Sequence, residues 1–213
     1  MGEEEKPRSR KTGRKVLVGF MLAFFVLIIM IAESGGGGGH QSAPNTAASA
    51  SVTAAPRTPL PTAETALIRA VDEARQTYAT AANDMAKGAA RPTRARAICR
   101  FLRNRAVLGW IGTVRTLSTN GDGKGVLGVR IAPHVTVETW NNDLSDLGDK
   151  TLIAPASPLF TAASALHKGQ LVIFSGRFFH SSTDCIEESS ITLEGSLDDP
   201  GFIFRFATIA PAH

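Results

Sequence analysis

An apolar run near the N-terminus constrains this chain more than any other feature. It begins at Val16 and ends at Ala32, and none of its seventeen residues is charged, polar or proline. A helix rising about 1.5 Å per residue covers roughly 25 Å over this length, close to the ~30 Å hydrocarbon core of a bilayer. The run therefore predicts one transmembrane helix at residues 16–32, with the membrane as the first partner of the chain.

The charges on the two sides of this run predict its direction. Residues 1–15 contain six Lys and Arg residues, whereas Arg57 is the only cation in the thirty residues after the run. Because a Lys and Arg excess marks the cytoplasmic side, residues 1–15 are expected to form a cytoplasmic basic tail. A cleaved signal peptide is the alternative, but the run is longer than the usual h-region and Met30-Ile31-Ala32 is a poor cleavage site. These two details favour a retained anchor.

Two segments follow the predicted anchor. Residues 33–61 consist almost entirely of Gly, Ala, Ser, Thr and Pro, which predicts a flexible linker with an end-to-end distance on the order of 30 Å. Residues 62–106 predict a helical hairpin or stalk. Thr62 is expected to cap its first helix, and apolar residues from Leu67 to Met85 recur at helical spacing before a stop at Gly88. A second helix is expected over residues 93–103.

The second helical segment is rich in arginine. Its six arginines are Arg91, Arg94, Arg96, Arg100, Arg103 and Arg105. Such a segment binds phosphates of nucleic acid or lipid headgroups, or docks on an acidic part of the same protein. Residues 63–106 carry nine cations and four anions, a net +5, whereas residues 107–213 carry seven cations and eleven anions, a net −4. This complementarity favours internal docking.

Residues 107–213 predict one β-rich domain. Alternating apolar and polar positions indicate strands near residues 110–117, 127–131 and 135–139, with a hairpin turn at residues 120–123. A short helix is expected at residues 157–166, and further strands at 171–179, 190–195 and 202–209. Trp110, Phe174 and Phe204 are expected in the core. The predicted class is α+β: a transmembrane helix, a flexible linker, a helical hairpin or stalk, and a five- to six-stranded OB-like β-barrel.

Two stretches of this domain carry a resemblance. Trp110-x-Gly112-x-Val114 resembles the first strand of an OB fold, where a glycine permits the sharp coil that closure needs. Residues 169–176 (GQLVIFSG) resemble the fourth OB strand. The chain is similar to uncharacterised bacterial single-pass membrane proteins that end in a C-terminal OB-fold-like domain. The resemblance implies a binding module in the bacterial envelope and supplies no catalytic residues. With the charge asymmetry, it predicts a bacterial inner-membrane protein whose C-terminal domain is periplasmic.

Motifs for chemistry are weak in this chain. Residues 123–128 match G-x-G-x-x-G but read as a strand, which excludes the helix that a dinucleotide site needs. Asp143, Asp146 and Asp149 supply oxygen ligands without the spacing of an EF-hand loop, and the histidines lack close-spaced partners. No cofactor and no metal are therefore expected. Nucleophile motifs are also missing, so the protein is expected not to be an enzyme.

Cys99 and Cys185 are the only cysteines. Two thiols outside the cytoplasm more often pair than remain free, which favours a disulfide between the arginine-rich helix and the barrel. Two unrelated buried thiols are the alternative.

The leading functional hypothesis is a membrane-anchored periplasmic OB-like module that binds a protein or another envelope ligand, without catalysis of its own. Trp140 is the aromatic residue expected to be exposed. The alternative is a nucleic-acid-binding protein that uses residues 91–105, although a net acidic barrel with buried aromatics makes nucleic acid an unlikely ligand. The candidate binding residues are Trp140, Asn141, Asn142, Asp143, Arg94, Arg96 and Arg100.

Overall fold

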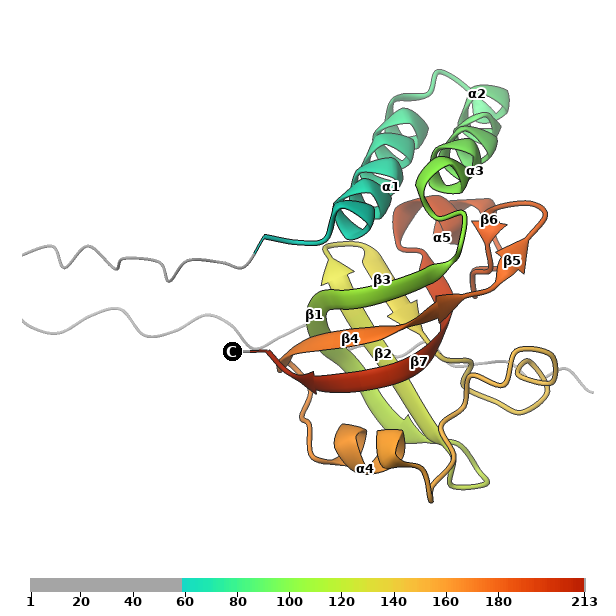
Figure 1. Ribbon diagram of the computed structural model, residues 1–213. Coiled ribbons are helices and arrows are strands. Elements are labelled where there is room, and N and C mark those ends of the chain that lie inside the picture. The colour runs from blue at the N-terminus through green and yellow to red at the C-terminus, as the bar shows by residue number, and fades with distance from the viewer. Residues whose placement is uncertain (1–58, 213) are drawn as a thin grey trace, which may run out of the picture. The chain divides into compact units, whose positions relative to one another are not determined.

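The computed structural model describes residues 59–212, which form a mixed α+β structure (Figure 1). The predicted cytoplasmic tail, the anchor at residues 16–32 and nearly all of the linker lie outside the described residues. Within residues 59–212, no helix has both the length and the apolar character to cross a membrane.

Five strands form a closed barrel. They are β1 (Ala106–Thr119), β2 (Gly125–Ala132), β3 (Val135–Glu138), β4 (Leu171–Phe178) and β7 (Gly201–Pro211). Their order is β1-β2-β3-β7-β4, and β4 pairs back onto β1 to close the ring. All neighbours are antiparallel except β3 and β7, which run parallel. Five to six strands were predicted and this sheet has five, with β1 longer than its apolar alternation indicated.

Aromatic side chains fill the barrel. Trp110, Phe174 and Phe204 are buried, as predicted, and Phe178 joins them with its ring centroid 4.8 Å from that of Phe204. These rings come from β1, β4 and β7, and their edge-to-face arrangement is the favourable one for aromatic pairs. The period-two pattern of phenylalanines in β7 thus places one face of that strand in the core.

Helices lie at both ends of the barrel. Figure 1 shows α1 (Thr62–Thr80) beside α3 (Ala90–Phe101) at one end and α4 (Pro158–Ser164) at the other. The short α2 (Asp84–Gly88) connects the first two. Pro92 is tolerated in the first turn of α3 because the amides of a first turn lack intrahelical partners. The predicted helical hairpin and the short helix near residues 157–166 are both present.

Two details of the first helix differ from the prediction. The helix ends at Thr80 instead of continuing to Gly88, because Asn83 starts a new helix by accepting a hydrogen bond from the Ala86 amide. The turn removes Met85 from the buried stripe and leaves it 91% exposed. Thr62 is the first helical residue and not a cap, since Pro61 precedes the helix without a side-chain hydrogen bond.

The strand predicted at residues 190–195 is wrong. This stretch ends in helix α5 (Leu193–Asp198), whose first turn is capped by the Thr192 hydroxyl accepting from the Gly195 amide. Before it, β5 (His180–Ser181) and β6 (Cys185–Ile186) form a small hairpin outside the barrel. Buried Leu197 packs with Ala74 and Ala90, so α5 closes the contact between the barrel and the helices.

Candidate functional site

The arginines of α3 are divided between two faces of the helix. Arg91 and Arg94 face the barrel, where Arg91 donates to Asp184 at 2.7 and 2.6 Å. Arg94 is fully buried and its Nη2 donates to Asp184 and Glu188, both at 3.0 Å. Its Nη1 also donates to the Ser196 carbonyl of α5. Asp184 and Glu188 thus supply the acidic surface on which the arginine-rich segment was expected to dock. Arg94 therefore joins α3 to the rest of the domain instead of binding a ligand.

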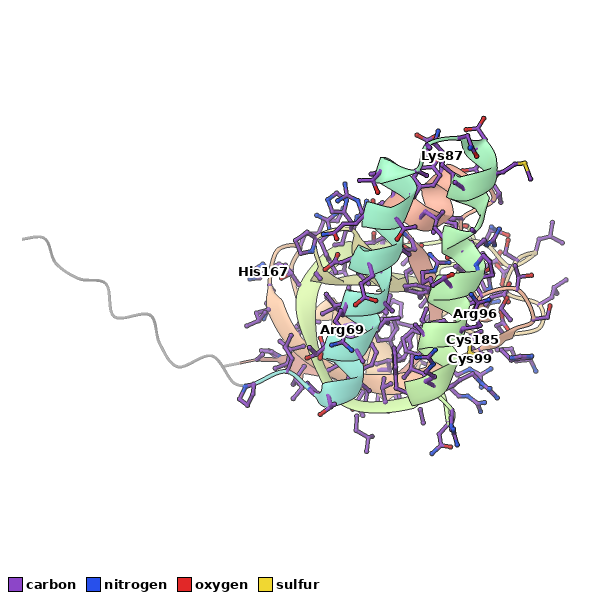
Figure 2. All side chains as sticks on the ribbon, turned by 90° about the horizontal axis from the view of Figure 1, so that it is seen from above. Arg69, Lys87, Arg96, Cys99, His167 and Cys185 are labelled. Atoms are coloured by element: carbon purple, nitrogen blue, oxygen red, sulfur yellow. A yellow bond between two sulfur atoms is a disulfide. The ribbon has the colours of Figure 1, made fainter. Side chains whose placement is uncertain are left out.

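The other arginines of α3 face solvent. Arg96 and Arg100 are exposed, and Figure 2 shows Arg96 on the same side of the helix as the two cysteines. Cys99 and Cys185 form a disulfide with their Cα atoms 5.6 Å apart. The predicted bridge between the arginine-rich helix and the barrel domain is therefore confirmed, and it lies beside the ionic cluster.

A second surface feature, a large groove, lies over β2, β3 and the segment at residues 187–191. It has a volume of about 700 Å³, and its lining includes Trp140 and Asn141 together with Glu138, Glu187 and Ile191. Backbone hydrogen bonds fix one wall to β7: the Ile203 amide donates to the Glu187 carbonyl, and the Ser189 amide donates to the Gly201 carbonyl. We call this the acidic groove.

Carboxylates dominate the electrostatics of the acidic groove. Burial raises the pKa of Glu187 above its usual range, and the negative charges of Asp149 and Asp184 raise it further. Burial also raises the pKa of Glu188, against the opposing effect of Arg94. The Glu138 carboxylate accepts from the Ser189 hydroxyl at 2.8 Å. No Lys, Arg or His is among the described residues that line the groove.

Trp140, the aromatic residue expected to be exposed, is half-buried. Its indole Nε1 donates to Asp149 at 3.0 Å, and its backbone amide donates to the Thr151 hydroxyl at 2.8 Å. These bonds hold the ring at one end of the acidic groove. Trp140 and Asn141 are thus two predicted binding residues that the structure brings together in this groove.

The remaining predicted residues of this loop serve local structure. Asn142 accepts from the Ser145 amide at 2.9 Å and shapes a turn. Asp143 forms an ion pair with Lys124 and accepts from Asn120, and the Lys124 contact lowers the pKa of its carboxyl. Asp146 accepts from the Thr151 amide and the Leu152 amide. The described residues contain no group of three or more His, Cys, Asp or Glu side chains arranged to hold a metal ion.

The sequence analysis did not identify the three glutamates of the groove, Glu138, Glu187 and Glu188, or the exposed Ile191. Residues 187–190 (EESS) lie between Ile186 and Ile191, a pattern that carries no recognised motif. Ile191 is 99% exposed because it lies in the turn that leads into α5. The wrong strand prediction at residues 190–195 did not include this turn. The one available signal was a pair of adjacent glutamates with no cation nearby in the sequence.

Comparisons of this chain with protein-family models, with curated proteins and with solved structures found no match.

Proposed function

We propose that the barrel is an OB-like module that binds a cationic segment of a protein partner through the acidic groove and carries out no catalysis of its own. The strand order β1-β2-β3-β7-β4, with a helix between β3 and β4, supports the OB-like assignment. The anchor at residues 16–32 and the linker at residues 33–61 would hold this module at the periplasmic face of a bacterial inner membrane.

One observation carries the proposal: two carboxylates of the groove, Glu138 and Glu187, form no ion pair within residues 59–212. Glu187 has no ion pair among the described residues, and its pKa is already raised by burial and by like charges. Glu138 has only a hydroxyl for a partner. A positive charge beside these carboxylates would offset both the burial and the like-charge repulsion that disfavour the ionised form of Glu187. A Lys or Arg side chain entering the groove would therefore be bound favourably.

Apolar groups around the groove favour a protein as the source of that cation. Ile191 is almost completely exposed, and the loop that contributes Asn141 and Ser145 also exposes Leu144 and Leu147. Trp140 directly precedes this loop in sequence and adds an aromatic ring to the groove lining. Protein interfaces combine such aromatic and apolar contacts with a polar rim, which suits an extended segment that alternates apolar and cationic residues.

The acidic groove counts against the nucleic-acid alternative at this face. Its carboxylates would repel a phosphate backbone, and its single tryptophan is tied to Asp149. The alternative also loses Arg91 and Arg94, since both are already paired inside the protein. Binding through the groove therefore agrees with the charges better than binding through residues 91–105.

The test titrates the full-length protein in phosphatidylcholine nanodiscs with a synthetic peptide of alternating lysine and leucine. Trp140 and buried Trp110 are the only tryptophans, so the fluorescence change should come from Trp140 and vanish in a Trp140→Phe variant. We expect saturable binding that weakens at least about tenfold when Glu138 and Glu187 are both replaced by Gln, given the strength of charge-assisted contacts.

Two controls make the result specific. A peptide with glutamine in place of lysine should bind much more weakly. Glu73→Gln, on the exposed face of α1, should leave the affinity unchanged. Equal binding of both peptides, or an unchanged affinity in the double groove variant, would contradict the proposal.

A further inference from the structure

A second hollow lies between α3 and the β5–β6 hairpin. Its volume is about 510 Å³. Arg96 and Arg100 line it from α3, and His180, Ser182 and Thr183 line it from the hairpin. The Cys99–Cys185 disulfide joins the two sides, so the hollow is built from segments about 85 residues apart in sequence and covalently fixed. We call it the basic hollow.

Arg96 and Arg100 are free to bind a ligand. They lie four residues apart on one exposed face of α3. Within residues 59–212, neither Arg96 nor Arg100 forms an ion pair; Arg96 donates only to the Thr93 hydroxyl, at 3.0 Å. The nearest acidic group of the hairpin, Asp184, is already held by Arg91 and Arg94.

The donors of the basic hollow match a phosphate group. Two guanidinium groups, an imidazole and two hydroxyls from Ser182 and Thr183 face the same open space. Arginine is the side chain best suited to bind phosphate oxygens through paired N–H groups. No aromatic side chain other than His180 is among the lining residues that the structure describes, so nucleobases would find little stacking surface.

We propose that the basic hollow binds the headgroup phosphate of an anionic phospholipid. The site is distinct from the acidic groove, because the two cavities share no lining residue. The predicted linker at residues 33–61 would keep the domain within roughly 30 Å of the bilayer, where membrane phosphates are the most abundant anions. Docking through Arg96 and Arg100 would hold the tethered domain against the membrane in one orientation.

The experiment measures how fast phenylglyoxal modifies individual arginines in the full-length protein, by peptide mass spectrometry. The protein is placed in nanodiscs of phosphatidylcholine alone, or of phosphatidylcholine and phosphatidylglycerol in equal parts. Arg69, exposed on α1, is the internal control in the same molecules (Figure 2). We expect phosphatidylglycerol to slow modification of Arg96 and Arg100 about fivefold or more, since each basic residue near such a surface contributes about that factor.

A variant tests whether the two arginines act together. Arg100→Gln should restore much of the modification rate of Arg96 in phosphatidylglycerol nanodiscs, whereas Arg69→Gln should leave it slow. High salt should also restore it, because the contact is electrostatic and solvent-exposed.

Four outcomes would overturn the assignment. The first is an unchanged rate at Arg96 and Arg100, and the second is an equal slowing at Arg69, which would indicate unspecific attraction. The third is equal protection by inorganic phosphate in phosphatidylcholine nanodiscs, which would assign the hollow to free phosphate. The fourth is stronger protection by single-stranded DNA than by phosphatidylglycerol, which would assign it to nucleic acid.

Discussion

Arg94 of α3 donates from Nη2 to Glu188 at 3.0 Å, although 94 residues separate the two in sequence. Glu188 lines the acidic groove, and the Arg94 side chain is fully buried. The Ser196 hydroxyl donates to the same carboxylate and so adds α5 to the contact. One ion pair therefore connects the helical layer to a wall of the candidate binding site.

Replacing Arg94 by Met should destabilise the protein strongly. The change leaves Asp184 and Glu188 buried with only Arg91 to compensate them, and loss of one partner of a buried pair costs about 3–5 kcal/mol. Arg96→Met, two residues away but exposed, should change the free energy of unfolding by less than about 0.5 kcal/mol. Urea unfolding of the two variants makes the comparison, and equal losses would contradict the structural role of Arg94.

Glu64→Gln should remove a pH-dependent part of the stability. Burial raises the pKa of Glu64 to about 7, and its carboxylate oxygens accept from the Ile111 amide at 3.2 and 3.1 Å without a cationic partner. Below pH 4.5, the pKa of this carboxyl in the unfolded chain, Glu64 is protonated in both the folded and the unfolded state and does not lower the free energy of unfolding. As the pH rises towards 7 the unfolded state ionises first, so the folded state loses up to roughly 3 kcal/mol.

The measurement for Glu64 is the difference between wild type and variant in free energy of unfolding, from pH 4 to pH 8. Glu187 and Glu188 titrate in both proteins, so they largely cancel in this difference. We expect the free energy of unfolding of the variant to increase relative to that of wild type as the pH rises, and the difference to become constant above about pH 7. A difference that stays constant over this range would show that Glu64 does not titrate there.

The disulfide should be complete in the native protein and should stabilise it. A thiol count on denatured, unreduced protein should find no free thiol, and two reactive thiols would contradict the bridge. Joining residues 86 apart stabilises by about 4 kcal/mol in the chain-entropy model. A Cys99→Ser, Cys185→Ser double variant should therefore unfold at lower denaturant concentration yet keep the same fold, since the ionic cluster still holds α3.

Gly112→Ala should destabilise the barrel. A Cβ atom at Gly112 would lie 2.6 Å from Val129 Cγ1 and 2.7 Å from the Arg130 carbonyl oxygen. Because both neighbours belong to the paired strand β2, relief requires a backbone shift, and such overpacking costs about 1–3 kcal/mol. Gly121→Ala is the matched control, because no atom lies within 4 Å of a Cβ there. The Gly112→Ala variant should melt at a lower temperature than the Gly121→Ala variant. Equal melting temperatures would contradict the steric role of Gly112.

Much of the fold could be predicted from local pattern, and the failures have local causes. The alternation in β1, β2, β4 and β7 identified those strands because one face of each packs in the core. The strand prediction at residues 190–195 was wrong because the Thr192 hydroxyl caps helix α5. That side-chain hydrogen bond outweighs the strand preference of the short segment around it. The prediction that Met85 continues the buried face of the first helix was wrong, because Asn83 starts a new helix in which Met85 faces solvent.

The sequence by itself determined the division of the chain into a predicted anchor, a linker, a helical segment and a β-rich domain, because hydropathy and residue periodicity are local properties. It also indicated the pairing of Cys99 with Cys185, since no other cysteine exists. Only the tertiary structure decided which charges remain available. Arg94 and Arg96 are two residues apart and chemically identical, yet helix geometry buries one against Glu188 and leaves the other in an open hollow. Glu138 and Glu187 meet in one groove because β3 and β7 pair in parallel, a contact that no local pattern encodes.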